Sequence, residues 1–106
     1  MIQKVNDILV ELRRELQSLY LERLERILLF GSQARGDAAP DSDIDVLVVL
    51  KGSVQPGTEI DRTSHLVAEL SLANNVVVSC VFISSHRYAV EQSPLLLNVR
   101  REGVAI

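Results

Sequence analysis

The sequence predicts a small α/β (α+β) fold, in which a small mixed β-sheet packs against helices. Short continuous apolar runs alternate with longer segments of helical periodicity, which is the pattern of strands separated by helices. Hydrophobic residues make up 47% of the chain, enough to bury one core and to argue against disorder. Because 106 residues suit one such core, we expect a single domain over residues 1–106.

The first element is an amphipathic helix predicted over residues 2–20. Its apolar residues recur at helical spacing, with charged and polar residues between them: Ile2, Val5, Ile8, Leu9, Leu12, Leu16 and Leu19. These positions spread over a wide face. After covering the sheet, we expect the helix to leave a strip for a partner protein or for self-association as a homo-oligomer.

Two short apolar runs predict buried strands on either side of one polar loop. The first run covers residues 27–30 and is stopped by Gly31, and the second covers residues 44–50. Between them, residues 31–36 can form a brief helical turn and residues 37–42 are rich in turn-forming types.

The second half of the chain predicts a helix followed by a third strand. Thr58 is a plausible N-cap for a helix through residue 74, and the strand is expected from residue 75 or 76 to residue 83. Ser84 or Ser85 then caps a short helix through Val90. A last helix opens at Ser93-Pro94 and stops at Gly103.

Composition excludes several classes of function. A net charge of −3 provides no basic surface for a phosphate backbone, so no nucleic-acid partner is expected. The lone Cys80 permits no internal disulfide, which suits a reducing cytoplasm, and it is expected to be a buried apolar residue. No apolar run approaches membrane-spanning length and no signal peptide is evident, so we expect a cytoplasmic protein without membrane contact. His65 and His86 are assigned no role.

Gly31-Ser32 follows a predicted strand and is a candidate phosphate-binding turn. Glycine permits a tight turn and a close approach of phosphate to backbone amides, while a helix beginning here would favour an anion and Ser32 would add a hydroxyl donor. On its own the pair is weak evidence, because Gly-Ser after an apolar run is usually only a turn.

Asp43 and Asp45 are candidate metal ligands. The two-residue period of a strand puts both carboxylates on one face, where they repel each other unless a cation binds between them. Mg²⁺ is typically held by one or two carboxylates together with substrate phosphates. The alternative is a capped turn at residues 41–43 and an exposed Asp45. Aspartate is depleted in strands, and Ile44 and Val46 on either side should be buried, which weakens that alternative.

The segments Gly31-Ser32-Gln33-Ala34-Arg35-Gly36 and Ser42-Asp43-Ile44-Asp45-Val46-Leu47-Val48 closely resemble the signature of the DNA polymerase β-like nucleotidyltransferase superfamily. With its short chain, the protein looks like the minimal nucleotidyltransferases (MNT), which occur in prokaryotes beside a HEPN-domain partner in toxin–antitoxin pairs. The resemblance therefore implies a polymerase β-like nucleotidyltransferase fold, a HEPN-domain protein partner and an antitoxin role.

The resemblance also implies roles for individual residues. Gly31 and Ser32 would bind the triphosphate, and Asp43 and Asp45 would be the catalytic residues that ligate Mg²⁺. Arg35 matches a basic position of the motif, where it could bind nucleotide or pair with an acidic neighbour in the loop. The implied reaction transfers AMP from ATP to a hydroxyl of the partner, such as a tyrosine, with release of pyrophosphate.

The chain departs from the family pattern at a third carboxylate, which active members generally place on the strand after the next helix. The predicted strand from residue 75 contains no acid, and alternation makes Asn75 or Ser79 the expected occupant of that position. Neither side chain supplies a negative charge or an obvious base. An acid from the middle helix could replace it only if that helix faced the site; the candidates are Glu59, Asp61 and Glu69.

Three interpretations remain open from the sequence. The first is an active or weakly active nucleotidyltransferase that modifies its partner. The second is a catalytically impaired binding module that neutralises or scaffolds a partner by contact. The third is an unrelated small α/β scaffold whose match to the motif is accidental.

Overall fold

The computed structural model describes residues 3–39 and 42–106 and has the mixed α/β architecture that the sequence predicts. Within these residues, one sheet has the strand order β3-β2-β1-β4. The strands are β1 (Leu24–Phe30), β2 (Ile44–Leu50), β3 (Val78–Ser84) and β4 (Val104–Ala105). β1 is antiparallel to both β2 and β4, whereas β2 and β3 are parallel. The sheet is therefore mixed, as expected.

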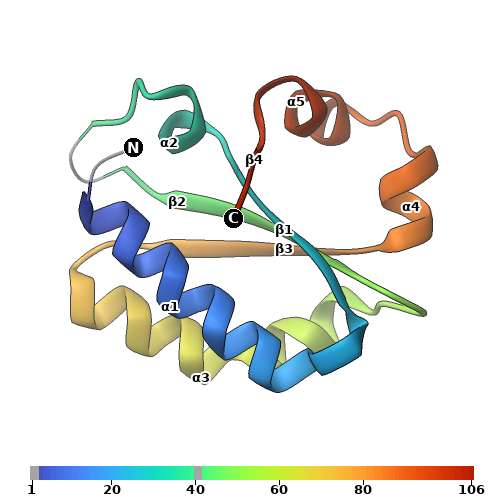
Figure 1. Ribbon diagram of the computed structural model, residues 1–106, viewed down its shortest axis with the longest axis horizontal. Helices are drawn as coiled ribbons and strands as arrows, with labels where there is room; N and C mark the ends of the chain where they lie inside the picture. The colour runs from blue at the N-terminus through green and yellow to red at the C-terminus, as the bar shows by residue number, and fades with distance from the viewer. Residues whose placement is uncertain (1–2, 40–41) are drawn as a thin grey trace.

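Helices cover both faces of this sheet (Figure 1). The two long ones, α1 (Gln3–Tyr20) and α3 (Pro56–Asn74), pack together on one face. The shorter α4 (Ser85–Val90) and α5 (Pro94–Glu102) lie on the other, and the four-residue α2 (Ser32–Arg35) follows β1. A 3-10 turn, η1 (Leu21–Arg23), joins α1 to β1. We call the two sides of the sheet the α1/α3 face and the α4/α5 face.

β2 is the centre of the core because both of its faces are buried. Ile44, Val46, Val48 and Leu50 contribute to the cluster under α1 and α3, while Leu47 and Val49 contribute to the cluster under α4 and α5. All six side chains are 0% exposed. The continuous apolar run of residues 44–50 is thus explained by burial on both sides, and its bounds match the predicted strand.

Several predicted boundaries are confirmed by the capping residues. Ser84 accepts a hydrogen bond from the Arg87 amide at the start of α4, and Ser93 accepts one from the Leu96 amide at the start of α5. Gly103 ends α5, as predicted. The first helix ends at Tyr20 as expected, and its predicted first residue, Ile2, lies outside the described residues.

Other boundaries were wrong. α3 begins at Pro56 with Gln55 as its N-cap, so Thr58 lies inside the helix, because proline is well accommodated in a first helical turn. β1 begins at Leu24 rather than at residue 27. β3 begins at Val78, because Asn75 has a left-handed φ of 51° and ends α3. The short strand β4 was not predicted at all.

A buried polar network lies where α1 meets α3. The Tyr20 hydroxyl donates to Glu59 Oε1 at 2.7 Å, and Glu59 is only 3% exposed. The guanidinium groups of Arg23 and Arg62 lie 3.9 and 3.8 Å from the same carboxylate.

None of the helices in the described part of the chain combines the length and hydropathy that crossing a membrane requires.

Candidate functional site

β1 ends in a sharp turn at Gly31 that leads directly into α2. Gly31 has a φ of 75°, which glycine adopts readily and L side chains adopt rarely. Its carbonyl accepts hydrogen bonds from the amides of Ala34 and Arg35, both at 3.1 Å. Gly36, also with positive φ, ends the helix. The helical turn predicted for residues 31–36 is therefore present as α2.

Asp45 lies against this turn. It pairs with Phe30 across β1 and β2, which places it beside the end of β1. A Cβ built on Gly31 would lie 2.6 Å from Asp45 Oδ2, closer than real Cβ atoms come to other atoms. Glycine suits position 31 because of its positive φ, and the absence of a Cβ leaves the Asp45 carboxylate close to the turn without any shift of its side chain.

Asp43 directly precedes β2 and is exposed, whereas Asp45 is half-buried. Burial raises the pKa of the Asp45 carboxyl above its ordinary value of 3.8, and the negative charge of Asp43 raises this pKa further. No cation or hydrogen-bond donor among the described residues acts in the opposite direction. The two carboxylates therefore form an electrostatically unfavourable pair, which a bound cation would relieve.

Ser79, one of the two residues that the sequence offers for the position of a third carboxylate, lies in β3. It is paired in register with Asp45 across the parallel strands β2 and β3, so the two side chains share a face of the sheet. Ser79 is exposed and uncharged. The other candidate, Asn75, is the C-cap of α3 and lies outside the strand, so strand alternation does not apply to it.

No acid of α3 substitutes for the missing carboxylate. α3 packs on the α1/α3 face, whereas Asp45 shares the α4/α5 face with Leu47 and Val49. Glu59 is engaged with Tyr20, and Glu69 is exposed and lies 3.0 Å from His65. In the described residues, no three His, Cys, Asp or Glu side chains come together as a set of metal ligands.

Arg35 is held by acidic neighbours. Its Nε donates to Asp37 at 3.2 Å, and its Nη1 donates to Glu102 of α5, also at 3.2 Å. The pairing with a loop acid is one of the two roles that the sequence analysis considers for this residue. The bond to Glu102 also ties α2 to α5.

Gln33 contacts the loop before β2 and was not among the residues predicted from the sequence. Its Nε2 donates to the carbonyl of Ser42 at 3.2 Å, and so joins α2 to the residue before Asp43. The bond spans nine residues of polar loop and helps to fix the distance between the Gly31 turn and the acidic pair. No sequence spacing signals this contact, because it depends on the course of the loop.

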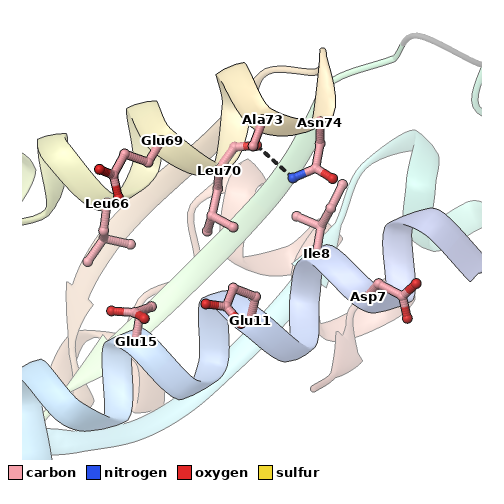
Figure 2. Close-up of a pocket in the computed structure, with 9 residues that line it drawn as sticks. All are labelled: Asp7, Ile8, Glu11, Glu15, Leu66, Glu69, Leu70, Ala73 and Asn74. Atoms are coloured by element: carbon pink, nitrogen blue, oxygen red, sulfur yellow. Dashed lines mark hydrogen bonds between the residues drawn. The ribbon is translucent and has the colours of Figure 1, made fainter.

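A second concave region lies away from these residues, between α1 and α3 (Figure 2). This hollow of about 430 Å³ has carboxylates from both helices and an apolar part formed by Ile8, Leu66 and Leu70. It lies on the α1/α3 face, and Glu11 and Glu69 on its rim are paired with Arg14 and His65. It is therefore separate from the Asp43–Asp45 pair.

Comparison with known proteins identifies similar sequences. Residues 9–93 match a family model described as a nucleotidyltransferase domain. Two relatives from Methanocaldococcus jannaschii each bear the name "Putative protein adenylyltransferase". One is 35% identical over 88 residues, covering 76% of this chain and 86% of the relative. The other is 29% identical over 76 residues, covering 72% of this chain and 76% of the relative.

Solved structures share the fold. A chain in a toxin–antitoxin structure with AMP-PNP has a TM-score of 0.65 at 21% identity, covering 98% of this chain and 72% of that chain. A chain from the complex of tri-AMPylated Shewanella oneidensis HEPN toxin with MNT antitoxin has a TM-score of 0.55 at 20% identity, covering 98% of this chain and 71% of that chain. At these identities the similarity establishes the architecture alone.

Proposed function

Because the chain belongs to the nucleotidyltransferase domain family, we propose that it binds ATP with Mg²⁺ at the Gly31 turn and transfers AMP to a hydroxyl of a partner protein. The observation that carries this proposal is the close approach of the Asp45 carboxylate to the Gly31 turn, where a Cβ would lie 2.6 Å from Oδ2. Phosphate at the turn and a cation at the carboxylate would then be neighbours.

The residues present fit Mg²⁺. Its usual ligands in phosphate-transfer sites are one or two carboxylates plus oxygens of the substrate phosphates. Asp43 and Asp45 are two such carboxylates, and burial and mutual repulsion already disfavour the ionised state of Asp45 in the absence of a cation. When bound, the metal neutralises phosphate charge and polarises the phosphorus–oxygen bonds.

Each side chain then has a defined task. Gly31 lets the backbone come close to the triphosphate, and the Ser32 hydroxyl donates to a phosphate oxygen. Asp43 and Asp45 are the proposed catalytic residues, because their carboxylates would hold the cation. Gln33 positions the loop that carries Asp43 through its bond to Ser42. Arg35 braces α2 against α5 through Glu102, and its charge also favours the phosphates.

The proposed reaction is an in-line displacement. The acceptor oxygen forms a bond to the α-phosphorus, the bond from that phosphorus to the α,β-bridging oxygen breaks, and pyrophosphate leaves with the electron pair. The acceptor proton passes to water or to a phosphate oxygen, since Ser79 is no base. The acceptor we propose is a tyrosine hydroxyl of a HEPN-domain protein, with this chain as its antitoxin. The names of the relatives and of the tri-AMPylated HEPN toxin complex support this choice.

Ser79 favours a second candidate function. A serine in register with Asp45 leaves the site one negative charge short of the three-carboxylate arrangement described for active members of the superfamily. The alternative is therefore a catalytically impaired module that keeps nucleotide affinity and neutralises its partner by contact.

Transfer of label distinguishes these two functions. The chain is co-expressed with a HEPN-domain protein, the class of partner proposed, and is incubated with Mg²⁺ and either α-labelled or γ-labelled ATP. An active transferase labels the partner from α-labelled ATP alone. The Asp43→Asn/Asp45→Asn variant should abolish labelling, while Asp61→Asn on the opposite face should leave it unchanged. If native protein transfers no label, the enzyme proposal is wrong; label that appears only with Ser79→Asp would support the impaired module.

A further inference from the structure

We propose that the outer edge of β3 pairs with the same edge of a second copy of this chain, which extends the sheet across a two-fold axis. This inference concerns a surface away from the nucleotide turn and holds whether or not the chain transfers AMP. It rests on the backbone groups of β3, on the side chains beside them and on the sequence of the strand itself.

β3 is an edge strand, and within the described residues only β2 pairs with it. Two hydrogen bonds fix its orientation. The Ile44 amide donates to the Val77 carbonyl, whereas the Val78 amide points away from β2 and donates to Ser71 Oγ of α3. Because backbone groups alternate in direction along a parallel strand, those of Cys80 and Phe82 point to the open edge.

Nothing in this strand protects its edge. Natural edge strands usually carry a charge, a proline or a bulge, or are very short, because an exposed edge recruits further strands. β3 has seven residues, Val78-Ser79-Cys80-Val81-Phe82-Ile83-Ser84, without any charge or proline. By contrast, β4 on the other side of the sheet has only two residues. The β4 edge of the sheet is thus protected by its shortness, whereas the β3 edge is not.

Apolar surface lies on both sides of the β3 edge. One hollow of about 270 Å³ lies toward α3 and is lined by Ile60, Val67 and Cys80 among others. A second of about 250 Å³ lies toward α4 and α5 and is lined by Ile60, Val81 and Leu95 among others. Ile60 is 52% exposed and Val81 is 36% exposed. An added strand would cover both of these side chains.

The strand is complementary to itself when two copies run antiparallel about Val81. In this register Cys80 lies opposite Phe82 of the other copy, so the outward backbone groups of both residues form hydrogen-bonded pairs. Ser79 then lies opposite Ile83, so Phe82 and Ile83 each face a small side chain, and Val81 faces Val81 at the two-fold axis. The strand brings no like charges together, although each chain has a net charge of −3.

The neighbouring register is less favourable. Centring the pair on Cys80 would place Phe82 opposite Val78, whose amide is already bonded to Ser71 Oγ. The Val81-centred pair also brings Val78 opposite Ser84, but only at the two ends of the ladder, and its two central pairs, each Cys80 with Phe82, use backbone groups that point to the open edge. This is why a second copy, whose edge has the same pattern of free groups and small residues, is the occupant that we propose.

Sedimentation equilibrium from micromolar to submillimolar concentration tests the proposal directly. We expect a reversible monomer–dimer equilibrium of the native chain. Val81→Lys places like charges opposite each other and should weaken the dimer at least about tenfold, the change that a loss of roughly 1.4 kcal/mol produces. The matched control is Val10→Lys on α1, where the native valine is 61% exposed, and it should dimerise as the native chain does.

Cross-linking tests the register. In a Cys80→Ser/Val81→Cys variant, the two introduced thiols would face each other at the two-fold axis, and mild oxidation should give a covalent dimer. A Cys80→Ser/Val10→Cys variant should not. A native chain that stays monomeric at all concentrations would overturn the proposal. So would a dimer that Val10→Lys disrupts and Val81→Lys leaves intact, which would place self-association on α1.

Discussion

Glu59 and Asp45 are both withdrawn from solvent, but only Glu59 has partners within the described residues. Glu59 accepts a hydrogen bond from Tyr20 at 2.7 Å and lies within 4 Å of two guanidinium groups. Asp45 lies against Gly31 and near Asp43, and its surroundings only raise its pKa. Burial of a charge is costly unless it is paired, so the first carboxylate is stabilised by the fold and the second is not.

The difference separates a structural acid from a candidate functional one. Replacing a paired acid should destabilise the fold and leave ligand binding alone. Replacing an unpaired acid should do the reverse, because the fold gains nothing from its charge. Both lie in the same α/β fold, so each provides the control for the other.

The largest effect is expected from Asp45→Asn. We expect transfer of AMP to fall about 1000-fold, equivalent to roughly 4 kcal/mol of transition-state stabilisation, because the cation loses a charged ligand. The variant should unfold at the same temperature as the native chain or slightly higher, since repulsion from Asp43 disappears. Labelling rates and thermal unfolding measure the two properties. A variant that loses activity because it unfolds would contradict this assignment.

Glu59→Ala should affect stability instead. Removing the carboxylate leaves the Tyr20 hydroxyl without its acceptor and two arginines without a nearby counter-charge, and hydrogen bonds to charged groups contribute about 1.5 to 3 kcal/mol. We expect the free energy of unfolding in urea to fall by about that amount, with the label transfer of the folded protein unchanged. Glu69→Ala on the exposed part of α3 is the control and should cost less than about 0.5 kcal/mol.

Gly31→Ala should sharpen the comparison by testing the contact itself. An alanine held at the φ of 75° should lower the free energy of unfolding by about 1 kcal/mol, and the clash of its Cβ with Asp45 Oδ2 should lower it further. Gly52→Ala is the matched control, because Gly52 has a φ of 82° with nothing within 4 Å of the added Cβ. If the two variants are equally stable in urea, the close contact at Gly31 has no energetic consequence. Combining Gly31→Ala with Asp45→Ala should remove the extra cost.

The smallest effect is a pH dependence at Asp45. The pKa of this carboxyl is raised in the folded state above its ordinary 3.8, so the native state binds the proton more tightly than the unfolded state does. Its contribution to stability is therefore fully present below pH 3.8 and lost as the pH rises through the folded pKa. In the presence of a chelator, the free energy of unfolding of Asp45→Asn should increase relative to that of the native chain as the pH rises from acidic to neutral. A pH-independent difference would contradict the direction of the shift.

Local patterns in the sequence predicted the elements that depend on few neighbours. The bounds of β2 follow from an uninterrupted apolar run, and the caps Ser84 and Ser93 act on amides three residues away. The placement of Asp45 beside the Gly31 turn also follows from short-range information, since one loop joins two strands that pair with each other.

The missed features depend on distant contacts. β4 has only two residues and exists because it pairs with Leu28 and Leu29 of β1. The burial of Glu59 depends on Tyr20, which lies 39 residues earlier. Likewise, the sequence limited the missing carboxylate position to Asn75 or Ser79, but the register of β3 against β2 was needed to favour Ser79. Periodicity gives the faces of a strand and leaves its alignment with a neighbour open.

The contact between Gly31 and Asp45 has a thermodynamic consequence for the proposed ligands. The Gly31 turn, which would receive phosphate, lies directly beside the Asp45 carboxylate, which would hold a cation. Binding of either ligand would therefore change the electrostatic field at the position of the other. Whatever factor the cation contributes to nucleotide affinity, the nucleotide must contribute to cation affinity by the same factor. At low concentrations of both, the site should therefore fill cooperatively, with each ligand rarely bound alone.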